Sequence, residues 1–111
     1  MNVAIVTPQM IIGGAEQYII TKSKWLVENG HDVIIISEGG ENVKNLPNKV
    51  RHFQLEKISQ PTYLFKYGRL LEMYYQLSRI LKDERIDIVE AHNTWPIIHV
   101  IGAYKLSLIH I

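Results

Sequence analysis

The sequence predicts an α/β fold in which helices cover both faces of a parallel sheet. Residues 3–6 (VAIV) and 33–36 (VIII) are short apolar runs, typical of strands that are buried on both faces. A helical pattern over residues 15–29 lies between them and completes a strand–helix–strand unit. The 111 residues, 47% of them hydrophobic, suffice for one core and one domain.

Two residues of this strand–helix–strand unit mark where its first strand and its helix end. Pro8 ends the first strand, and Gly30 suits the left-handed position that follows a helix. We expect the helix to pack through one face, because its apolar residues recur at helical spacing. The residues of this predicted face are Tyr18, Ile19, Trp25 and Leu26.

The middle of the chain is less regular. Residues 38–48 are rich in glycine, asparagine and charge and predict a loop, whereas the polar alternation over 50–55 predicts a strand at the sheet edge. A long helical pattern runs over residues 63–82. Its predicted core-facing stripe consists of Leu64, Tyr67, Leu70, Leu71, Tyr74, Leu77, Ile80 and Leu81.

The last part of the chain predicts a fourth strand over residues 86–91 and a helix that begins near Pro96. The elements together predict a Rossmann-like, doubly wound parallel sheet of order 3-2-1-4 that is incomplete at its C-terminal end. We expect residues 1–105 to form this partial domain. The tail 106–111 is atypical: it is a stub of the next strand or is not native sequence, and the chain is interpreted as a fragment.

Composition narrows the functional classes. The net charge is +1 and the basic residues are scattered, which argues against a nucleic-acid binder. The sequence has no cysteine, no signal-peptide pattern and no uncharged apolar run of ~20 residues, so we expect a cytoplasmic protein. No histidines and carboxylates have metal-ligand spacing, and neither a P-loop nor a nucleophile elbow is present.

Ligands of such sheets bind at the carboxyl ends of the strands, where the strand order reverses. Two predicted segments meet there. Gly13 and Gly14 open the first helix, where free N–H groups attract phosphate, although a flexible loop is the simpler interpretation. His92 follows the fourth strand and either binds a substrate hydroxyl or is a structural histidine. We expect His31 to have a role in the turn at the end of the first helix. We expect the remaining histidines to be structural or incidental: His52, His99 and His110.

Three motifs in order carry a resemblance to a known family: IIGGAEQYI, ENGHDVIIIS and DERIDIVEAHNTW. Over residues 1–105 the chain resembles the N-terminal domain of glycosyltransferase family 4, which has the GT-B fold. The resemblance implies a retaining sugar transfer with no bound metal and no cofactor. It implies that a carbohydrate or lipid-linked acceptor binds mainly on this domain, and that the nucleotide-sugar donor binds mainly on a C-terminal domain.

The resemblance also implies roles for individual residues. Gly13 and Gly14 match the glycine-rich loop beside the donor diphosphate and the acceptor, and Glu16 matches the acidic position of that motif. His92 matches the histidine near the transferred sugar, and Asn93 follows it as a further binding residue. The catalytic basic residues and donor-binding carboxylates belong to the absent domain. We therefore expect no activity from this chain alone. We expect the full enzyme to be peripheral at the membrane.

Two other classes remain open at this point. A nicotinamide-binding dehydrogenase domain has the same topology, and Glu38 lies where a ribose-binding acid belongs; the Gly-x-Gly-x-x-Gly pattern, however, is missing. A non-catalytic α/β binding or interaction module is the other alternative.

Overall fold

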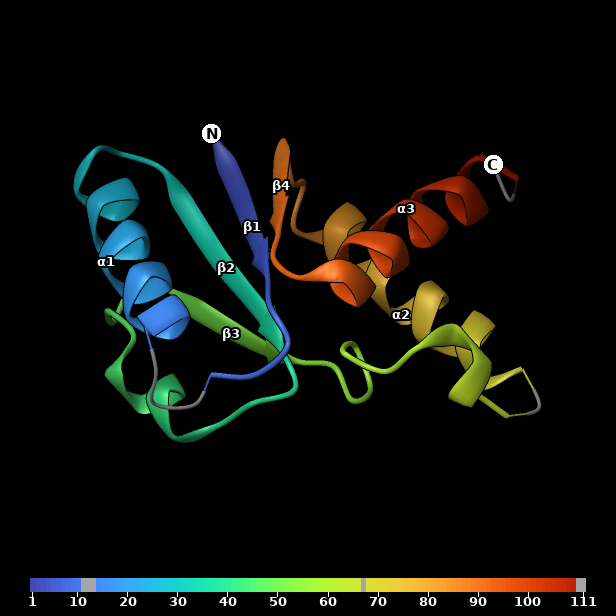
Figure 1. Cartoon of the computed structure of the whole chain (residues 1–111). Coiled ribbons are helices and arrows are strands. Elements are labelled where there is room, and N and C mark those ends of the chain that lie inside the picture. The colour runs from blue at the N-terminus through green and yellow to red at the C-terminus, as the bar shows by residue number, and fades with distance from the viewer. Residues whose placement is uncertain (11–13, 67, 110–111) are drawn as a thin grey trace.

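The computed structural model describes residues 1–10, 14–66 and 68–109. It contains a four-stranded parallel sheet of order β3-β2-β1-β4, formed by β1 (Asn2–Val6), β2 (Asp32–Ser37), β3 (Arg51–Gln54) and β4 (Ile88–Ala91). Helix α1 (Gly14–Glu28) lies on one face, and α2 (Arg69–Asp83) and α3 (Thr94–Ile109) lie on the other (Figure 1). The predicted fold class and strand order are confirmed.

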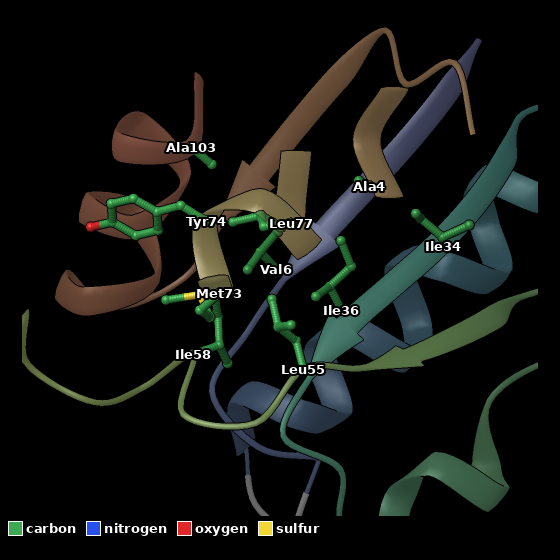
Figure 2. Close-up of a cluster of buried hydrophobic side chains, with 10 residues drawn as sticks. All are labelled: Ala4, Val6, Ile34, Ile36, Leu55, Ile58, Met73, Tyr74, Leu77 and Ala103. Atoms are coloured by element: carbon green, nitrogen blue, oxygen red, sulfur yellow. The ribbon is translucent and has the colours of Figure 1, made fainter. Parts of the chain in front are cut away.

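The two central strands alternate between two cores. Val3, Ile5, Val33 and Ile35 pack on the α1 side with Ile19 and Leu26. The residues between them face the α2–α3 side, as period-2 alternation requires. The core on that side, drawn in Figure 2, consists of Ala4, Val6, Ile34, Ile36, Leu55, Ile58, Met73, Tyr74, Leu77 and Ala103. Burial on both faces explains why residues 3–6 of β1 and 33–36 of β2 are wholly apolar.

The buried face of α1 differs from the prediction. Tyr18 and Trp25 are 52% and 58% exposed, whereas Ile19, Ser23 and Leu26 are buried. These three residues follow the spacing i, i+4, i+7 of a narrow stripe. Tyr18 and Trp25 each precede a stripe residue by one position, which turns them about 100° away from the sheet.

Helix α2 begins at Arg69, later than predicted. Gly68 adopts a left-handed conformation (φ 77°) directly before it, and a 3-10 turn (Thr62–Leu64) occupies the start of the predicted helix. Tyr74 and Leu77 are buried as expected and Met73 joins them, but Leu71 is 58% exposed. Tyr67 lies outside the described residues.

The expected strand stub in the tail 106–111 is wrong in its described part, because α3 continues as a helix through Ile109. No proline follows Pro96 to interrupt that helix. In the described part of the chain, β4 pairs only with β1, so its other edge is free and Ile88 is 47% exposed. β3 forms the opposite edge, as predicted, and the loop after β2 contains a 3-10 turn (Glu41–Asn45).

A fully buried histidine joins α3 to the layer beneath it. His99 donates from Nε2 to the Gln60 carbonyl oxygen over 2.7 Å, and its Nδ1 lies 3.1 Å from the Tyr74 hydroxyl oxygen. A donor on one ring nitrogen and an acceptor on the other describe a neutral imidazole. The expected structural role of His99 is confirmed, and burial lowers its pKa.

We predict that Gly102→Ala destabilises the chain. An added Cβ would lie 2.4 Å from Cε2 of the Tyr74 ring, which is buried and hydrogen-bonded to His99. Overpacking of this kind costs about 1–3 kcal/mol, although glycine to alanine within a helix ordinarily stabilises. Denaturant unfolding measures the change, with Lys105→Ala on the exposed side of α3 as the control. A Gly102→Ala variant as stable as wild type would contradict this packing.

We also predict that acid destabilises the fold through His99. Because burial lowers its pKa from 6.5, the unfolded chain binds a proton that the folded chain resists. The stabilisation is therefore complete above pH ~6.5 and declines as the pH falls toward the lowered value. Burial also lowers the pKa of His52, which adds to the effect. The slope of unfolding free energy against pH should become shallower in His99→Gln, and an unchanged slope would refute the assignment.

Candidate functional site

The site lies at the carboxyl edge of the sheet, where β1 and β4 end side by side. Val6 and Ala91 are register partners at the ends of these strands. The backbone N–H of His92 donates to the Val6 carbonyl oxygen over 2.8 Å, which extends the pairing by one residue. The chain leaves β1 toward one face and β4 toward the other, so His92 stands at the topological switch point.

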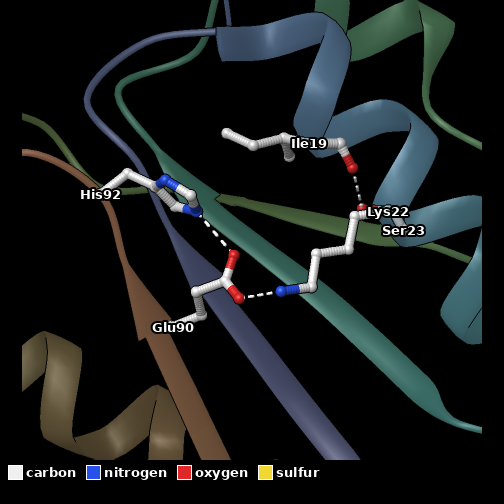
Figure 3. A network of polar contacts seen from close by, with 5 residues as sticks. All are labelled: Ile19, Lys22, Ser23, Glu90 and His92. Carbon is white, nitrogen blue, oxygen red and sulfur yellow. Dashed lines mark hydrogen bonds and ion pairs between the residues drawn. The ribbon is translucent and has the colours of Figure 1, made fainter.

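A carboxylate joins His92 to the first helix. Nε2 of His92 lies 2.7 Å from one carboxylate oxygen of Glu90, and the Lys22 ammonium group forms an ion pair with the other. Figure 3 shows the Glu90 carboxylate between the two side chains. Their exposed fractions are 26% for His92, 29% for Glu90 and 31% for Lys22, so the network is partly shielded from water.

Tyr18 completes this network from α1. Its ring meets the His92 ring edge-on, with 6.0 Å between the ring centroids, and the Lys22 ammonium group lies 5.8 Å from the Tyr18 centroid. Tyr18 and Lys22 are one helical turn apart and so share a face. This position accounts for the exposure of Tyr18, because its ring lies beside His92 at the carboxyl ends of the strands instead of packing on the sheet.

The charges of the network reinforce one another. The Glu90 hydrogen bond raises the pKa of Lys22. Burial alone would raise the pKa of Glu90, but the hydrogen bonds from Lys22 and His92 outweigh burial and lower it. Both residues therefore stay charged at neutral pH. An ion pair this exposed contributes about 0.2–1 kcal/mol, so orientation is its larger effect.

The segment leading to the glycine pair is anchored by the loop after β2. The Met10 N–H donates to the Gly39 carbonyl oxygen over 2.8 Å, and the Met10 carbonyl oxygen accepts from the Asn42 N–H over 2.7 Å. The Met10 side chain is fully buried. These contacts fix the chain after the carboxyl end of β1, just before the glycine-rich segment.

The predicted binding residues lie as follows. Gly14 is the first residue of α1, and Glu16 is in its first turn, with a side chain that the structure does not describe. Gly13 lies outside the described residues. Asn93 is exposed in a left-handed conformation (φ 71°) that asparagine tolerates, and it connects β4 to α3. The structure thus places His92 and Asn93 at the carboxyl ends of the strands, beside Lys22 and Tyr18 of α1. The binding and catalytic roles expected for His92 and Asn93 remain predictions.

Among residues 1–10, 14–66 and 68–109, no three histidine, cysteine or acidic side chains gather so as to hold a metal ion. Over the same residues, every helix is too short or too polar to cross a membrane. A hollow of about 510 Å³ lies between β3 and α2, lined by Phe53, Tyr75 and Arg79 among others, and does not include the residues around His92.

A protein-family model matches almost the whole chain. The sequence model of Glycosyltransferase Family 4 matches residues 12–110 of the 111. The chain belongs to glycosyltransferase family 4. No curated protein sequence matches it.

Solved structures share the fold of this family 4 chain. A glycosyltransferase from Rickettsia africae ESF-5 superposes with a TM-score of 0.70 and 24% identity, over 94% of this chain and 27% of that one. WaaG, a glycosyltransferase involved in lipopolysaccharide biosynthesis, superposes with a TM-score of 0.59 and 21% identity, over 82% of this chain and 23% of that one. The family 4 chain therefore spans about a quarter of the length of these relatives.

The family match and one set of contacts disfavour the dehydrogenase alternative. One carboxylate oxygen of Glu38 accepts from the Lys57 N–H over 3.2 Å, and the other accepts from the Ser59 hydroxyl. Both oxygens thus hold the loop after β3 in place. In this family 4 chain, Glu38 has a structural role instead of the ribose-binding role considered from the sequence.

Three residues of the network were not foreseen from the sequence: Tyr18, Lys22 and Glu90. The sequence does contain a signal for the proximity of Glu90 to His92. These residues are two apart at the end of a predicted strand, so their side chains point to the same face of the sheet. The sequence contains no such signal for Lys22 and Tyr18. Lys22 is 68 residues from Glu90 and contacts it only because α1 packs on the sheet.

Proposed function

We propose that this chain forms the acceptor-side part of a retaining glycosyltransferase, which moves a sugar from a nucleotide-sugar donor to a carbohydrate or lipid-linked acceptor. Family membership supports the reaction class. The observation that carries the proposal is the position of His92 at the switch point, beside the end of β1 and in contact with α1. A polar side chain here borders the crevice in which ligands of such sheets bind.

The proposed donor contacts lie at the start of α1. Gly13 and Gly14 let the donor diphosphate approach the backbone, and the N–H groups of the first helical turn favour its negative charge. Glu16, two residues into the helix, and Asn93, beside His92, are proposed to contact sugar or phosphate oxygens. No resident cofactor is needed, because the nucleotide sugar is a co-substrate.

His92 is proposed to contact the transferred sugar. Its ring projects from a backbone that is hydrogen-bonded to β1, so the sheet defines its position. A hydrogen bond that strengthens as charge develops on the sugar lowers the barrier and not only the binding energy. The remaining donor-binding groups are proposed to lie on a second domain, which is consistent with the share of the solved relatives that this chain spans. We place the reaction in the cytoplasm, with the complete enzyme peripheral at a membrane.

We predict that the chain alone has no measurable transferase activity. The proposed donor domain is not part of it, so no group is positioned to stabilise the leaving diphosphate. The assay mixes the purified chain with labelled nucleotide sugars and a panel of acceptors. Turnover that disappears in His92→Ala would refute this prediction.

We predict that His92→Ala in the complete enzyme lowers kcat by about 10²-fold while changing donor affinity far less. The lost contact acts mainly in the transition state, and loss of one such hydrogen bond costs about this factor. His31→Ala is the matched control, because His31 lies between α1 and β2, at the amino end of the strands and opposite to the end where His92 lies. Steady-state kinetics with circular dichroism measures both variants. An unchanged kcat and kcat/KM in His92→Ala would make the histidine structural.

A further inference from the structure

We propose that Glu90 is the positioning residue of this site. It fixes the His92 ring so that Nε2–H donates to the Glu90 carboxylate and Nδ1 stays free to accept a hydrogen bond from a ligand hydroxyl. The part about the ligand rests on the proposed function, whereas the geometry of the pair does not.

The backbone geometry makes the contact rigid. Glu90 is the register partner of Ile5, whose side chain packs on the α1 side, so the Glu90 side chain projects to that side as well. His92 lies two residues further on, and its N–H is bonded to Val6. Both side chains therefore project from paired backbone toward the same face, and their 2.7 Å contact does not depend on a flexible loop.

The proton of this contact has one possible location. An ionised carboxylate has only acceptor atoms, so the hydrogen must be on Nε2 of His92. Lys22 occupies the other oxygen of Glu90 and compensates its charge. The carboxylate thus needs no second cation, and the neutral Nε2–H form of His92 satisfies the contact.

The other ring nitrogen of His92, Nδ1, is then available to a ligand. In the neutral Nε2–H form, Nδ1 carries a lone pair and accepts hydrogen bonds. Within the part of the chain that the structure describes, Nδ1 of His92 has no hydrogen-bond partner. The Tyr18 ring meets the imidazole edge-on, with 6.0 Å between the two ring centroids. A sugar hydroxyl, which can donate to Nδ1, fits this arrangement.

Nuclear magnetic resonance of the histidine-labelled chain tests the geometry without substrate. We expect the His92 ring proton on Nε2 to be protected from exchange with water. Glu90→Ala should abolish this protection, and Glu90→Gln, whose amide oxygen still accepts, should retain part of it. Glu84→Gln is the matched control, because Glu84 pairs with Arg51 away from His92. Protection that survives in Glu90→Ala, or a wild-type proton on Nδ1 alone, would overturn the proposal.

Kinetics of the complete enzyme tests the consequence. Glu90→Ala should lower kcat about 10–100-fold, by analogy with the loss seen when hydrogen-bond partners of metal-ligating histidines are removed, and Glu90→Gln should restore most of it. The double variant with His92→Ala should be no slower than His92→Ala alone, because Glu90 acts through the ring. A further loss in the double variant would overturn the positioning role. If His92→Ala itself has no effect, the proposed function fails, while the resonance experiment still decides the geometry.

Discussion

The pairing of β1 with a strand on each side is the constraint on which the rest of the structure depends. β1 bonds to β2 and to β4 in parallel register, and its side chains alternate between two cores. Its four residues from Val3 to Val6 are buried, and each large apolar side chain contributes about 1.5–3 kcal/mol. Because β2 and β4 are reached by crossovers on opposite faces, the topological switch point lies at the carboxyl end of the same strand.

The layer of α2 and α3 is held by specific contacts as well as by apolar burial. Tyr74 packs in the core and also meets His99, while the close approach of Gly102 leaves no room for a larger residue. His99 in turn holds the Gln60 carbonyl oxygen in the loop after β3. Such a satisfied polar group sets one arrangement of the helices, whereas apolar contacts alone tolerate several.

The candidate site depends on the opposite layer. Glu90 lies in β4 and His92 directly follows it, whereas Lys22 and Tyr18 lie in α1, so the site depends on how α1 packs on the sheet. The ion pair is partly exposed and adds little to stability. The ion pair instead holds the Glu90 carboxylate, and through it the His92 imidazole, in one orientation.

The sequence by itself determined the fold class, the strand order and the position of His92. Wholly apolar runs identify β1 and β2, and the residue that follows a strand next to the switch point must lie at the crevice. Only the tertiary structure decided which face α1 buries and where α2 begins, because several apolar stripes compete on one helix and packing selects among them. It alone brought Lys22 to Glu90, since residues 68 positions apart meet only when the crossover helix docks on the sheet.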